Sequence, residues 1–439
     1  MDGSEIKVMF GSREVGRIFE SSNPLTLCFK YSQEWSLSGF PLSPSMPLNG
    51  MFSDEVATFF FQNTLPEGKA LTILSKHARL PESSVLGLCL YMRNDLVGAI
   101  RLENKNFPQQ PRSFRAVTFE ELAERLDSIR RYPITVWDGR PRLSLAGCQE
   151  KLNVLKLDNH FGLADGPDFC SDRILKFEAG SIPNLLLNEF LSLRLAREVG
   201  FVVNDARLIS IPRHRVLEII RFDRTVECVN GNVVVRRRHV IDGCQALGLV
   251  SERKYERNYS GDGYGYLYAD GVSFVKLASL SEFMSDPLKY KIQLLDWMIL
   301  NLLIGNSDGH GKNISFMRSP NGFVVAPWYD LVNIRLCDGI DQSLAMSIGE
   351  QFTFEDVHAL QVLWEADNLG LSKGVVSERL TKIVENVFAA LDKVKAPDFS
   401  TKEELLFTHR WKEDVKKACL KWRSEIKELP YLELGIVRK

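Results

Sequence analysis

Residues 290–315 read YKIQLLDWMILNLLIGNSDGHGKNIS, a long apolar segment that runs into a short cluster of polar side chains. The apolar part predicts a buried helix, and the cluster after it contains Asp308, Lys312 and Asn313. Polar groups cost free energy when they are buried, unless they are paired or bind a ligand. A polar loop at the end of a rigid apolar helix is therefore the first candidate for a functional site.

The polar loop has the residue spacing of a kinase catalytic loop. Asp308 and Asn313 follow the pattern D-x-x-x-x-N, in which the Asp accepts a hydroxyl proton and the Asn binds Mg²⁺. Asp330 follows an apolar, strand-like run, where a second carboxylate ligand of Mg²⁺ is expected. The spacing alone is common in polar turns, but the three residues in this order indicate phosphotransfer. Lys312 is a candidate for neutralising the transferred phosphate, whereas packing within the loop is the better interpretation of His310.

The composition is that of an ordinary globular protein. The 439 residues are 45% hydrophobic and 25% charged, and this length predicts two or three substructures. The net charge of -1 does not indicate a chain-wide nucleic-acid or membrane binder. The N-terminus does not resemble a signal peptide, and the apolar run of residues 290–304 is too short to span a bilayer. Eight Cys without a CxxC pair predict reduced thiols, so we expect a cytoplasmic protein.

Short apolar runs and turns dominate the first hundred or so residues. Strands are expected at residues 7–10, 25–31 and 98–102, and helices at residues 55–65 and 68–78. A polar, Pro-containing segment around Glu103 to Arg115 predicts a linker. Thr118 and Glu121 then form a capping-box pattern at the start of a helix.

The centre of the chain predicts a small sheet that carries one helix. Residues 142–224 are expected to run strand, turn, strand, strand, helix, strand, strand, and the chain beyond Arg224 is expected to be largely helical. This layout predicts an α+β, bilobal protein-kinase-like fold with an N-terminal β-rich accessory subdomain and a mainly helical C-terminal lobe. The expected domains are residues 1–110 (accessory), 111–224 (kinase N-lobe) and 225–439 (C-lobe).

Two residues of the centre are candidates for the ion pair of a kinase N-lobe. Lys176 is the only Lys on the strand RILKFE and could grip ATP phosphates, although an edge-strand or snorkelling Lys is the alternative. Glu189 lies in the middle of the expected helix and could orient Lys176. A solvent-facing Glu is the alternative interpretation of this position.

Two further stretches suit a nucleotide. The turn SLAGCQEK, from Ser144 to Lys151, contains Ala146 and Gly147, whose small size lets backbone N–H groups approach phosphates. It contains neither GxGxxG nor a Walker A pattern, so a plain hairpin is the alternative. The stretch IIRFDR ends the last strand before the helical half and is the natural inter-lobe hinge for adenine.

In this order along the chain, LSLAGCQEK, ILKF, NEFLSLRLAREVGF, RFDR, LIGNSDGHGKN and WYDLV resemble the HipA family of serine/threonine kinase toxins. The resemblance covers roughly Leu143 to Val332. In the N-terminal third, FFFQNTLPEG and RNDLVGAIRL are similar to the family's accessory segment.

The resemblance implies roles for individual residues. Asp308 would be the catalytic Asp, Asn313 and Asp330 would hold Mg²⁺, and Lys176 would bind the ATP phosphates. Ser144 matches the family's autophosphorylation serine. The loop whose amides cover the phosphates would comprise Ala146, Gly147, Cys148 and Gln149. The adenosine-binding hinge would comprise Ile220, Phe222 and Asp223. The family often has an acidic residue where this chain has Ile220, a change that a backbone contact would survive.

The resemblance also implies partners. These are a small HipB-like helix-turn-helix antitoxin, operator DNA through that complex, and a protein substrate, since family members phosphorylate aminoacyl-tRNA synthetases. Arg236, Arg237 and Arg238 and the basic stretch of residues 410–423 could contact DNA phosphates, although such runs are more often solvated faces. A small-molecule or lipid kinase and a pseudokinase-like co-repressor module are the alternative functions.

Overall fold

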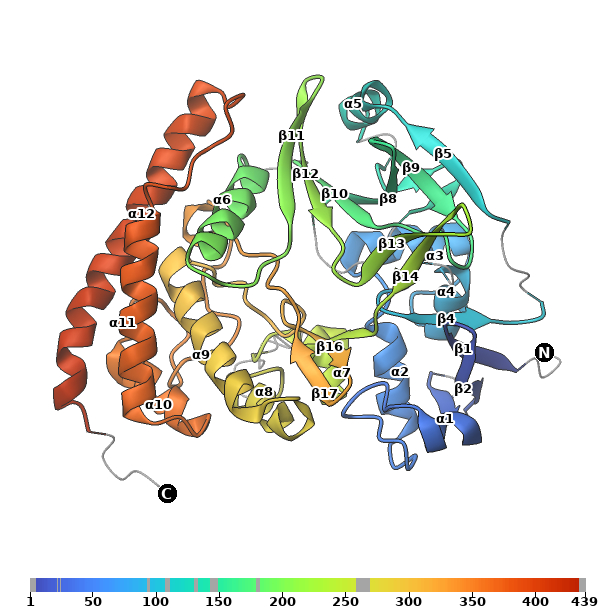
Figure 1. Ribbon diagram of the computed structural model, residues 1–439, viewed down its shortest axis with the longest axis horizontal. Helices are drawn as coiled ribbons and strands as arrows, with labels where there is room; N and C mark the ends of the chain where they lie inside the picture. The colour runs from blue at the N-terminus through green and yellow to red at the C-terminus, as the bar shows by residue number, and fades with distance from the viewer. Residues whose placement is uncertain are drawn as a thin grey trace. The chain divides into compact units, whose positions relative to one another are not determined.

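The computed structural model describes residues 5–21, 23, 25–92, 95–106, 111–129, 133–142, 149–178, 182–257 and 269–433. Helices and antiparallel sheets form two compact units (Figure 1). Unit 1 comprises Met1–Ala179, Asp205–Ser251 and Phe316–Arg318, and unit 2 comprises Gly180–Asn204, Glu252–Ser315 and Ser319–Lys439. The units cut across the predicted domain ranges, so the boundaries at residues 110 and 224 stay a prediction. The mixture of helices and sheets agrees with the predicted α+β class.

The first sheet of unit 1 has the strand order β3-β2-β1-β4. Its strands are antiparallel: β1 (Ile6–Phe10), β2 (Arg13–Glu20), β3 (Leu27–Tyr31) and β4 (Ile100–Glu103). The accompanying helices are α1 (Gln33–Ser38), α2 (Asp54–Gln62), α3 (Gly68–Ala78) and α4 (Val85–Met92). The Ser53 side chain caps α2 by accepting the N–H of Val56. The strands and helices predicted in this region are confirmed, with shifts at their ends.

The second sheet of unit 1 has the order β11-β12-β10-β8-β9-β5. Its antiparallel strands are β5 (Ser113–Val117), β8 (Lys151–Leu157), β9 (His160–Asp165), β10 (Arg173–Phe177), β11 (Ala206–Ile211) and β12 (His214–Ile220). Leu152, Leu175 and Val216 share one buried core with Leu122 of α5 (Phe119–Asp127). The predicted linker is wrong at its end, because residues from Ser113 onward pair with β9.

The prediction of a largely helical chain beyond Arg224 is wrong for its first part. The strands β13 (Arg224–Val229) and β14 (Asn232–Arg237) form a hairpin, and β15 (Val240–Asp242) and the short helix α7 (Gly243–Leu247) follow. A short strand pair needs little apolar sequence, because each strand of the hairpin satisfies the backbone of the other. The short strands β6 (Val136–Trp137), β7 (Arg140–Pro141), β16 (Ser315–Ser319) and β17 (Gly322–Val325) complete the described strands.

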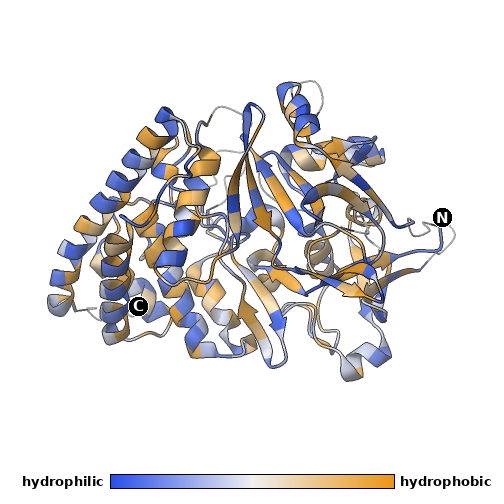
Figure 2. Ribbon diagram, turned by 45° about the horizontal axis from the view of Figure 1, so that its top comes forward, coloured by the Kyte–Doolittle hydropathy of each residue, from blue (hydrophilic) through white to orange (hydrophobic). Residues whose placement is uncertain are grey.

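Unit 2 is built from helices. They are α6 (Leu185–Glu198), α8 (Phe274–Ser279), α9 (Pro287–Ile304), α10 (Ala359–Asn368), α11 (Lys373–Ala390) and α12 (Lys402–Glu428). Short 3-10 turns cover Ser251–Lys254, Leu280–Phe283, Ile334–Leu336 and Leu429–Tyr431. Helices α9, α11 and α12 lie side by side (Figure 1). Figure 2 shows hydrophobic and hydrophilic residues alternating along the helices, as expected for amphipathic packing.

Helix α9 is the buried centre of unit 2. All of its residues from Leu294 to Ile304 are buried, including the polar Asp296 and Asn301. Asp296 is paired with Arg379 of α11, at 2.7 Å from Oδ1 to Nε. The predicted buried helix is thereby confirmed. No helix in the described part of the chain is long and apolar enough to cross a membrane.

Two buried carboxyl groups of unit 2 have raised pKa values. Burial raises the pKa of Glu365 on α10 to about 7, and the charges of Glu256 and Glu350 act in the same direction. The Glu365 carboxyl accepts the N–H of Gly349 at 3.1 Å. Burial also raises the pKa of Glu256, which accepts hydrogen bonds from Ser347.

Glu365→Gln should make the protein more stable than the wild type at pH 8 and leave it nearly unchanged at pH 4.5. A Glu side chain in the unfolded chain has an ordinary pKa near 4.5, so between about pH 4.5 and 7 the folded chain binds more protons than the unfolded chain. Stability therefore falls as pH rises through this window, by up to about 3 kcal/mol. Urea denaturation across this range measures it, and the exposed Glu403→Gln should keep the wild-type profile. If the stability of the wild type and of Glu365→Gln changed with pH in parallel, this would contradict the raised pKa of Glu365.

Candidate active site

The polar loop begins where α9 ends at Gly305. Gly305 is left-handed, with φ of 75°, and its N–H donates to the carbonyl of Asn301. The N–H of Asn306 donates to the same carbonyl at 2.9 Å, and the Asn306 side-chain amide donates to Asn301 Oδ1 at 3.0 Å. These bonds turn the chain sharply out of the helix and pair the two Asn side chains with each other, although the buried Oδ1 of Asn306 has no partner among the described residues.

The structure brings Asp308 and Asn313 together, as their spacing predicts. The Asp308 carbonyl accepts the N–H of His310 at 2.8 Å and Nδ2 of Asn313 at 2.7 Å. Oδ1 of Asp308 accepts the hydroxyl of Tyr255 at 2.8 Å. In the described part of the chain, Oδ2 of Asp308 and Oδ1 of Asn313 have no hydrogen-bond partner. One carboxylate oxygen and one amide oxygen are thus available for a substrate or a metal ion.

Asp330 follows Tyr329, whose side chain contacts this loop. The Tyr329 hydroxyl donates to the carbonyl of Lys312 at 2.7 Å and lies 2.7 Å from the Ser315 hydroxyl. Asp330 itself has a φ of 52°, a left-handed conformation that is uncommon for residues with a Cβ but that Asp adopts more readily than most. Nothing in the hydrogen bonds of the loop opposes the predicted role of Asp330.

The donor set suits a hard cation. No group of three His, Cys, Asp or Glu residues that could hold a metal ion is present within the described ranges. An Asn amide oxygen and an Asp carboxylate, completed by phosphate oxygens and water, are the ligands with which proteins hold Mg²⁺. Asn313 and Asp330 would therefore bind the ion only together with a phosphate-bearing ligand.

His310 and Lys312 are held by the loop itself. His310 is 6% exposed, and its Nδ1 accepts the N–H of Lys312 at 3.2 Å. Its ring meets the Tyr255 ring edge-on, with centroids 5.1 Å apart. These contacts support packing within the loop as the interpretation of His310. The neutralising role of Lys312, which is 6% exposed, stays a prediction.

Lys176 shares its sheet face with a second lysine that was not among the predicted site residues. Lys176 on β10 and Lys151 on β8 are direct cross-strand partners and are 9% and 5% exposed. Strand alternation places both on the face opposite Leu175 and Leu152. Two like charges directly opposite each other are destabilising, and both lysines have further polar interactions in the structure. The alternation in KLNVLKL could have revealed Lys151.

Glu189 is 1% exposed within α6, so the solvent-facing interpretation of this residue is wrong. Its helix is tied to the segment after Asp330, because the side chain of Asn188 donates to the Asn333 carbonyl at 2.9 Å and accepts its N–H at 2.8 Å. The sequence places Glu189 among apolar residues without showing which helix face is covered. Its pairing with Lys176 stays a prediction.

Much of the predicted phosphate turn lies outside the described residues, namely Ser144, Ala146, Gly147 and Cys148. Gln149 is described, and its buried side-chain Nε2 has no hydrogen-bond partner in the described part of the chain. This donor is available for an anion.

The hinge residue Ile220 points its side chain to the sheet face opposite Lys176. Lys176 pairs with Leu217, so Glu218 and Ile220 lie on the other face. There, Ile220 lines a cavity of about 370 Å³ together with Lys156, Asp158, Asn159, Arg173, Arg207 and Glu218. The N–H of Ile220 already donates to the carbonyl of Asp205 at 2.9 Å. Only its carbonyl remains for the predicted adenine contact.

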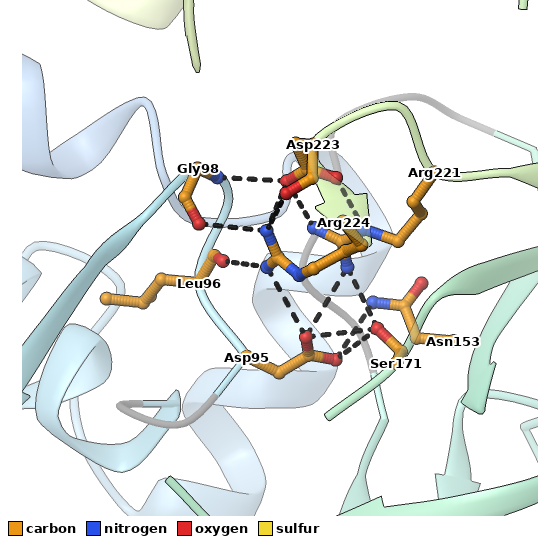
Figure 3. A network of polar contacts seen from close by, with 8 residues as sticks. All are labelled: Asp95, Leu96, Gly98, Asn153, Ser171, Arg221, Asp223 and Arg224. Carbon is orange, nitrogen blue, oxygen red and sulfur yellow. Dashed lines mark hydrogen bonds and ion pairs between the residues drawn. The ribbon is translucent and has the colours of Figure 1, made fainter. Parts of the chain in front are cut away.

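Asp223 is buried in a network of ion pairs at the end of β12 (Figure 3). Its carboxylate accepts Arg221 through Nε at 2.9 Å and Nη2 at 2.8 Å, and Arg224 through Nη1 at 2.6 Å. It also accepts the N–H of Gly98 at 3.1 Å. Burial alone would raise the pKa of Asp223, but the two guanidinium groups outweigh it and hold the pKa well below its usual range. With four donors on this carboxylate, an adenosine contact of residue 223 would have to come from its backbone.

The same network joins the end of β12 to the segment before β4. Arg224 donates to the carbonyls of Leu96 at 2.8 Å and Gly98 at 2.9 Å. Arg221 donates to the Ser171 hydroxyl at 2.9 Å, and Ser171 donates in turn to Asp95 at 2.8 Å. The motif RFDR predicts a hinge. Its charges pair within the motif, where Asp223 binds Arg221 and Arg224, and also with Asp95 and Gly98, which are more than 100 residues away in sequence.

Asp223→Asn should destabilise the folded protein by about 3 kcal/mol, because it leaves two buried guanidinium groups without their main counter-charge. Urea denaturation measures the change. Asp127→Asn is the matched control, since exposed Asp127 also pairs with an arginine, Arg213, and its loss should change stability little. Equal effects of the two substitutions would show that burial does not strengthen the Asp223 network.

Comparisons with known proteins bear on the whole chain. The family model described as HipA N-terminal domain matches residues 6–103, and that described as HipA-like C-terminal domain matches residues 143–394. The serine/threonine-protein kinase toxin HipA of Shewanella oneidensis MR-1 is 33% identical over 431 residues, 98% of each chain. A solved complex of Shewanella oneidensis MR-1 HipA, HipB and operator DNA contains a chain with 33% identity and a TM-score of 0.88, over 98% of this chain and 100% of that one.

Proposed function

We propose that this chain, which belongs to the HipA family of serine/threonine-protein kinase toxins, transfers the γ-phosphoryl group of ATP to a protein hydroxyl with the help of Mg²⁺. The kinase-like α+β fold and the kinase class come with the family. The use of ATP and Mg²⁺, the residue roles and the partners are the proposal. The observation that carries it is the pair of oxygen atoms at the predicted catalytic and metal-binding positions, Asp308 Oδ2 and Asn313 Oδ1, which have no hydrogen-bond partner among the described residues.

In the proposed reaction, the oxygen of the substrate hydroxyl bonds to the γ-phosphorus, and Asp308 Oδ2 accepts the proton of that hydroxyl. The bond from that phosphorus to the bridging oxygen of ADP breaks. Asn313 and Asp330 would hold Mg²⁺, which when bound would supply positive charge beside the phosphates. Lys176 and Lys151 attract the phosphates from their shared sheet face. The buried amide of Gln149 is a further donor toward the phosphates.

Autophosphorylation at Ser144 is proposed as an off switch. Phosphate at Ser144 would bring nearly two negative charges into the turn that precedes Lys151. If this turn binds the ATP phosphates through its amides, the added negative charge repels them. This repulsion is the physical reason to expect lower activity after modification.

Asp308→Asn should lower the phosphorylation rate by roughly two to four orders of magnitude, the usual contribution of a positioned acid–base group. Phosphopeptide mass spectrometry after incubation with Mg·ATP should find phosphate on Ser144 in the wild type and not in the variant. Calorimetry should show that the variant still binds Mg·ATP. Exposed Asp367→Asn is the matched control and should keep the wild-type rate.

Other outcomes of this experiment point elsewhere. Phosphate on free metabolites or lipid, with no labelled protein, would favour the small-molecule or lipid kinase. Absence of Mg·ATP binding would favour the co-repressor module. Adding purified aminoacyl-tRNA synthetases to the same assay tests them as the protein substrate.

A helix-turn-helix antitoxin and operator DNA are the proposed partners, in line with the HipA–HipB–operator complex of the relative. On α12, Trp411, Val415 and Cys419 face the core, and Lys416 and Lys417 are exposed. By contrast, exposed Arg236 of β14 is already paired with Glu227 at 3.2 Å. The basic face of α12 is therefore the better candidate for phosphate contacts.

In the complete complex with antitoxin and operator, the double substitution Lys416→Gln and Lys417→Gln should reduce the salt dependence of binding. The slope of log K against log salt should fall by about one per lysine that contacts a phosphate. Exposed Lys382→Gln on α11 is the control. Fluorescence anisotropy across a salt series measures the slope, and an unchanged slope would show that the face is only solvated.

A further inference from the structure

The residues on both sides of Tyr255 are hydrogen-bonded to segments around the catalytic loop. The N–H of Gly311 donates to the carbonyl of Lys254 at 2.9 Å. The N–H of Glu256 donates to the carbonyl of Ala345 at 2.9 Å. Ala345 is bonded in turn to the loop, because its N–H donates to the carbonyl of Ser307 at 2.8 Å. Tyr255 therefore lies between two backbone anchors.

A second set of contacts fixes the same segment from its other side. The N–H of Gly271 donates to the carbonyl of Glu256 at 3.1 Å, and that of Val272 to the carbonyl of Arg253 at 2.9 Å. A Cβ at Gly271 would lie 1.7 Å from the carbonyl oxygen of Tyr255, so only glycine fits there. The backbone that carries Tyr255 is therefore held in place by hydrogen bonds on both sides.

From this backbone, the Tyr255 side chain reaches the carboxylate of Asp308. Its hydroxyl donates to Oδ1 at 2.8 Å. Its ring meets His310 edge-on, with an interplanar angle of 89° and centroids 5.1 Å apart. The ring contact sets the direction of the hydroxyl, because a tyrosine ring has only two side-chain torsions.

We propose that Tyr255 is a positioning residue that holds one oxygen of Asp308 so that the other accepts the proton of the substrate. This inference rests on the proposed function of Asp308. The terminal torsion of an Asp carboxylate is soft and nearly two-fold, so an unheld carboxylate samples many orientations. A donor on Oδ1 fixes that torsion and leaves the lone pairs of Oδ2 to the substrate hydroxyl.

The opposite role for Tyr255 would be a block. A tyrosine hydroxyl that donates to the catalytic carboxylate resembles a substrate hydroxyl, and it would inhibit if it occupied the only acceptor. The structure favours positioning, because Oδ2 has no hydrogen-bond partner among the described residues. Oδ2 of Asp308 thus remains available as an acceptor while Tyr255 donates to Oδ1.

Tyr255→Phe tests the proposal, since it keeps the ring and its contact with His310 and removes only the hydroxyl. The kcat for protein phosphorylation should fall about tenfold, which corresponds to about 1.4 kcal/mol. The KM for ATP and the thermal midpoint should match those of the wild type. Tyr290→Phe is the control: it removes the buried hydroxyl that donates to the Leu277 carbonyl at 2.7 Å in the same unit, and it should lower the thermal midpoint without lowering kcat.

Each other outcome overturns the proposal in a recognisable way. An unchanged kcat in Tyr255→Phe, with Asp308→Asn inactive, would refute the role of Tyr255 alone. A higher kcat would show that the hydroxyl blocks the substrate. Parallel losses of kcat, ATP binding and thermal stability would make Tyr255 merely structural. An inactive wild type, or full activity in Asp308→Asn, would refute the proposed function and this inference together.

Discussion

Helix α9 is buried along its C-terminal half, so the polar atoms where it ends must be paired by the protein itself. Asn301 and Asn306 pair with each other, and the carbonyl of Asp308 takes hydrogen bonds from His310 and Asn313. Each bond removes a polar group that would otherwise be costly to bury. Among the described residues, Asp308 Oδ2, Asn313 Oδ1 and the buried Asn306 Oδ1 are left without a hydrogen-bond partner. The atoms proposed to do the chemistry are two of these three.

The buried charged side chains of unit 1 form two different arrangements. Around Asp223, two arginines and a backbone N–H satisfy the carboxylate, so the charges stabilise one another and leave no capacity for a ligand. On the sheet, Lys176 and Lys151 bring two like charges to one buried face. The first arrangement is what a structural junction requires, and the second carries the proposed contact with phosphates. The predicted hinge RFDR supplies the charged residues of the first arrangement, so this motif forms a structural junction.

Structural features that depend only on residues close together along the chain could be predicted from the sequence. The apolar period of α9 and the segment that forms α3 needed no tertiary information, and the D-x-x-x-x-N spacing placed Asp308 and Asn313 in one loop. Strand β5 could not be predicted, because its short polar sequence becomes a strand only by pairing with β9. Glu189 was misjudged for a related reason: a helix with apolar residues on all sides does not show which face will be covered.

The sequence by itself determined the family, the kinase class and the order of the site residues, because these depend on residue types at short spacings along the chain. Tertiary structure decided which atoms are free to act. It placed Tyr255 against Asp308 across 53 residues, put Lys151 opposite Lys176, and saturated Asp223 with arginines and Gly98. Hydrogen bonds and ion pairs depend on distances of a few ångströms in space. Sequence separation carries no information on such distances once the chain has folded back on itself.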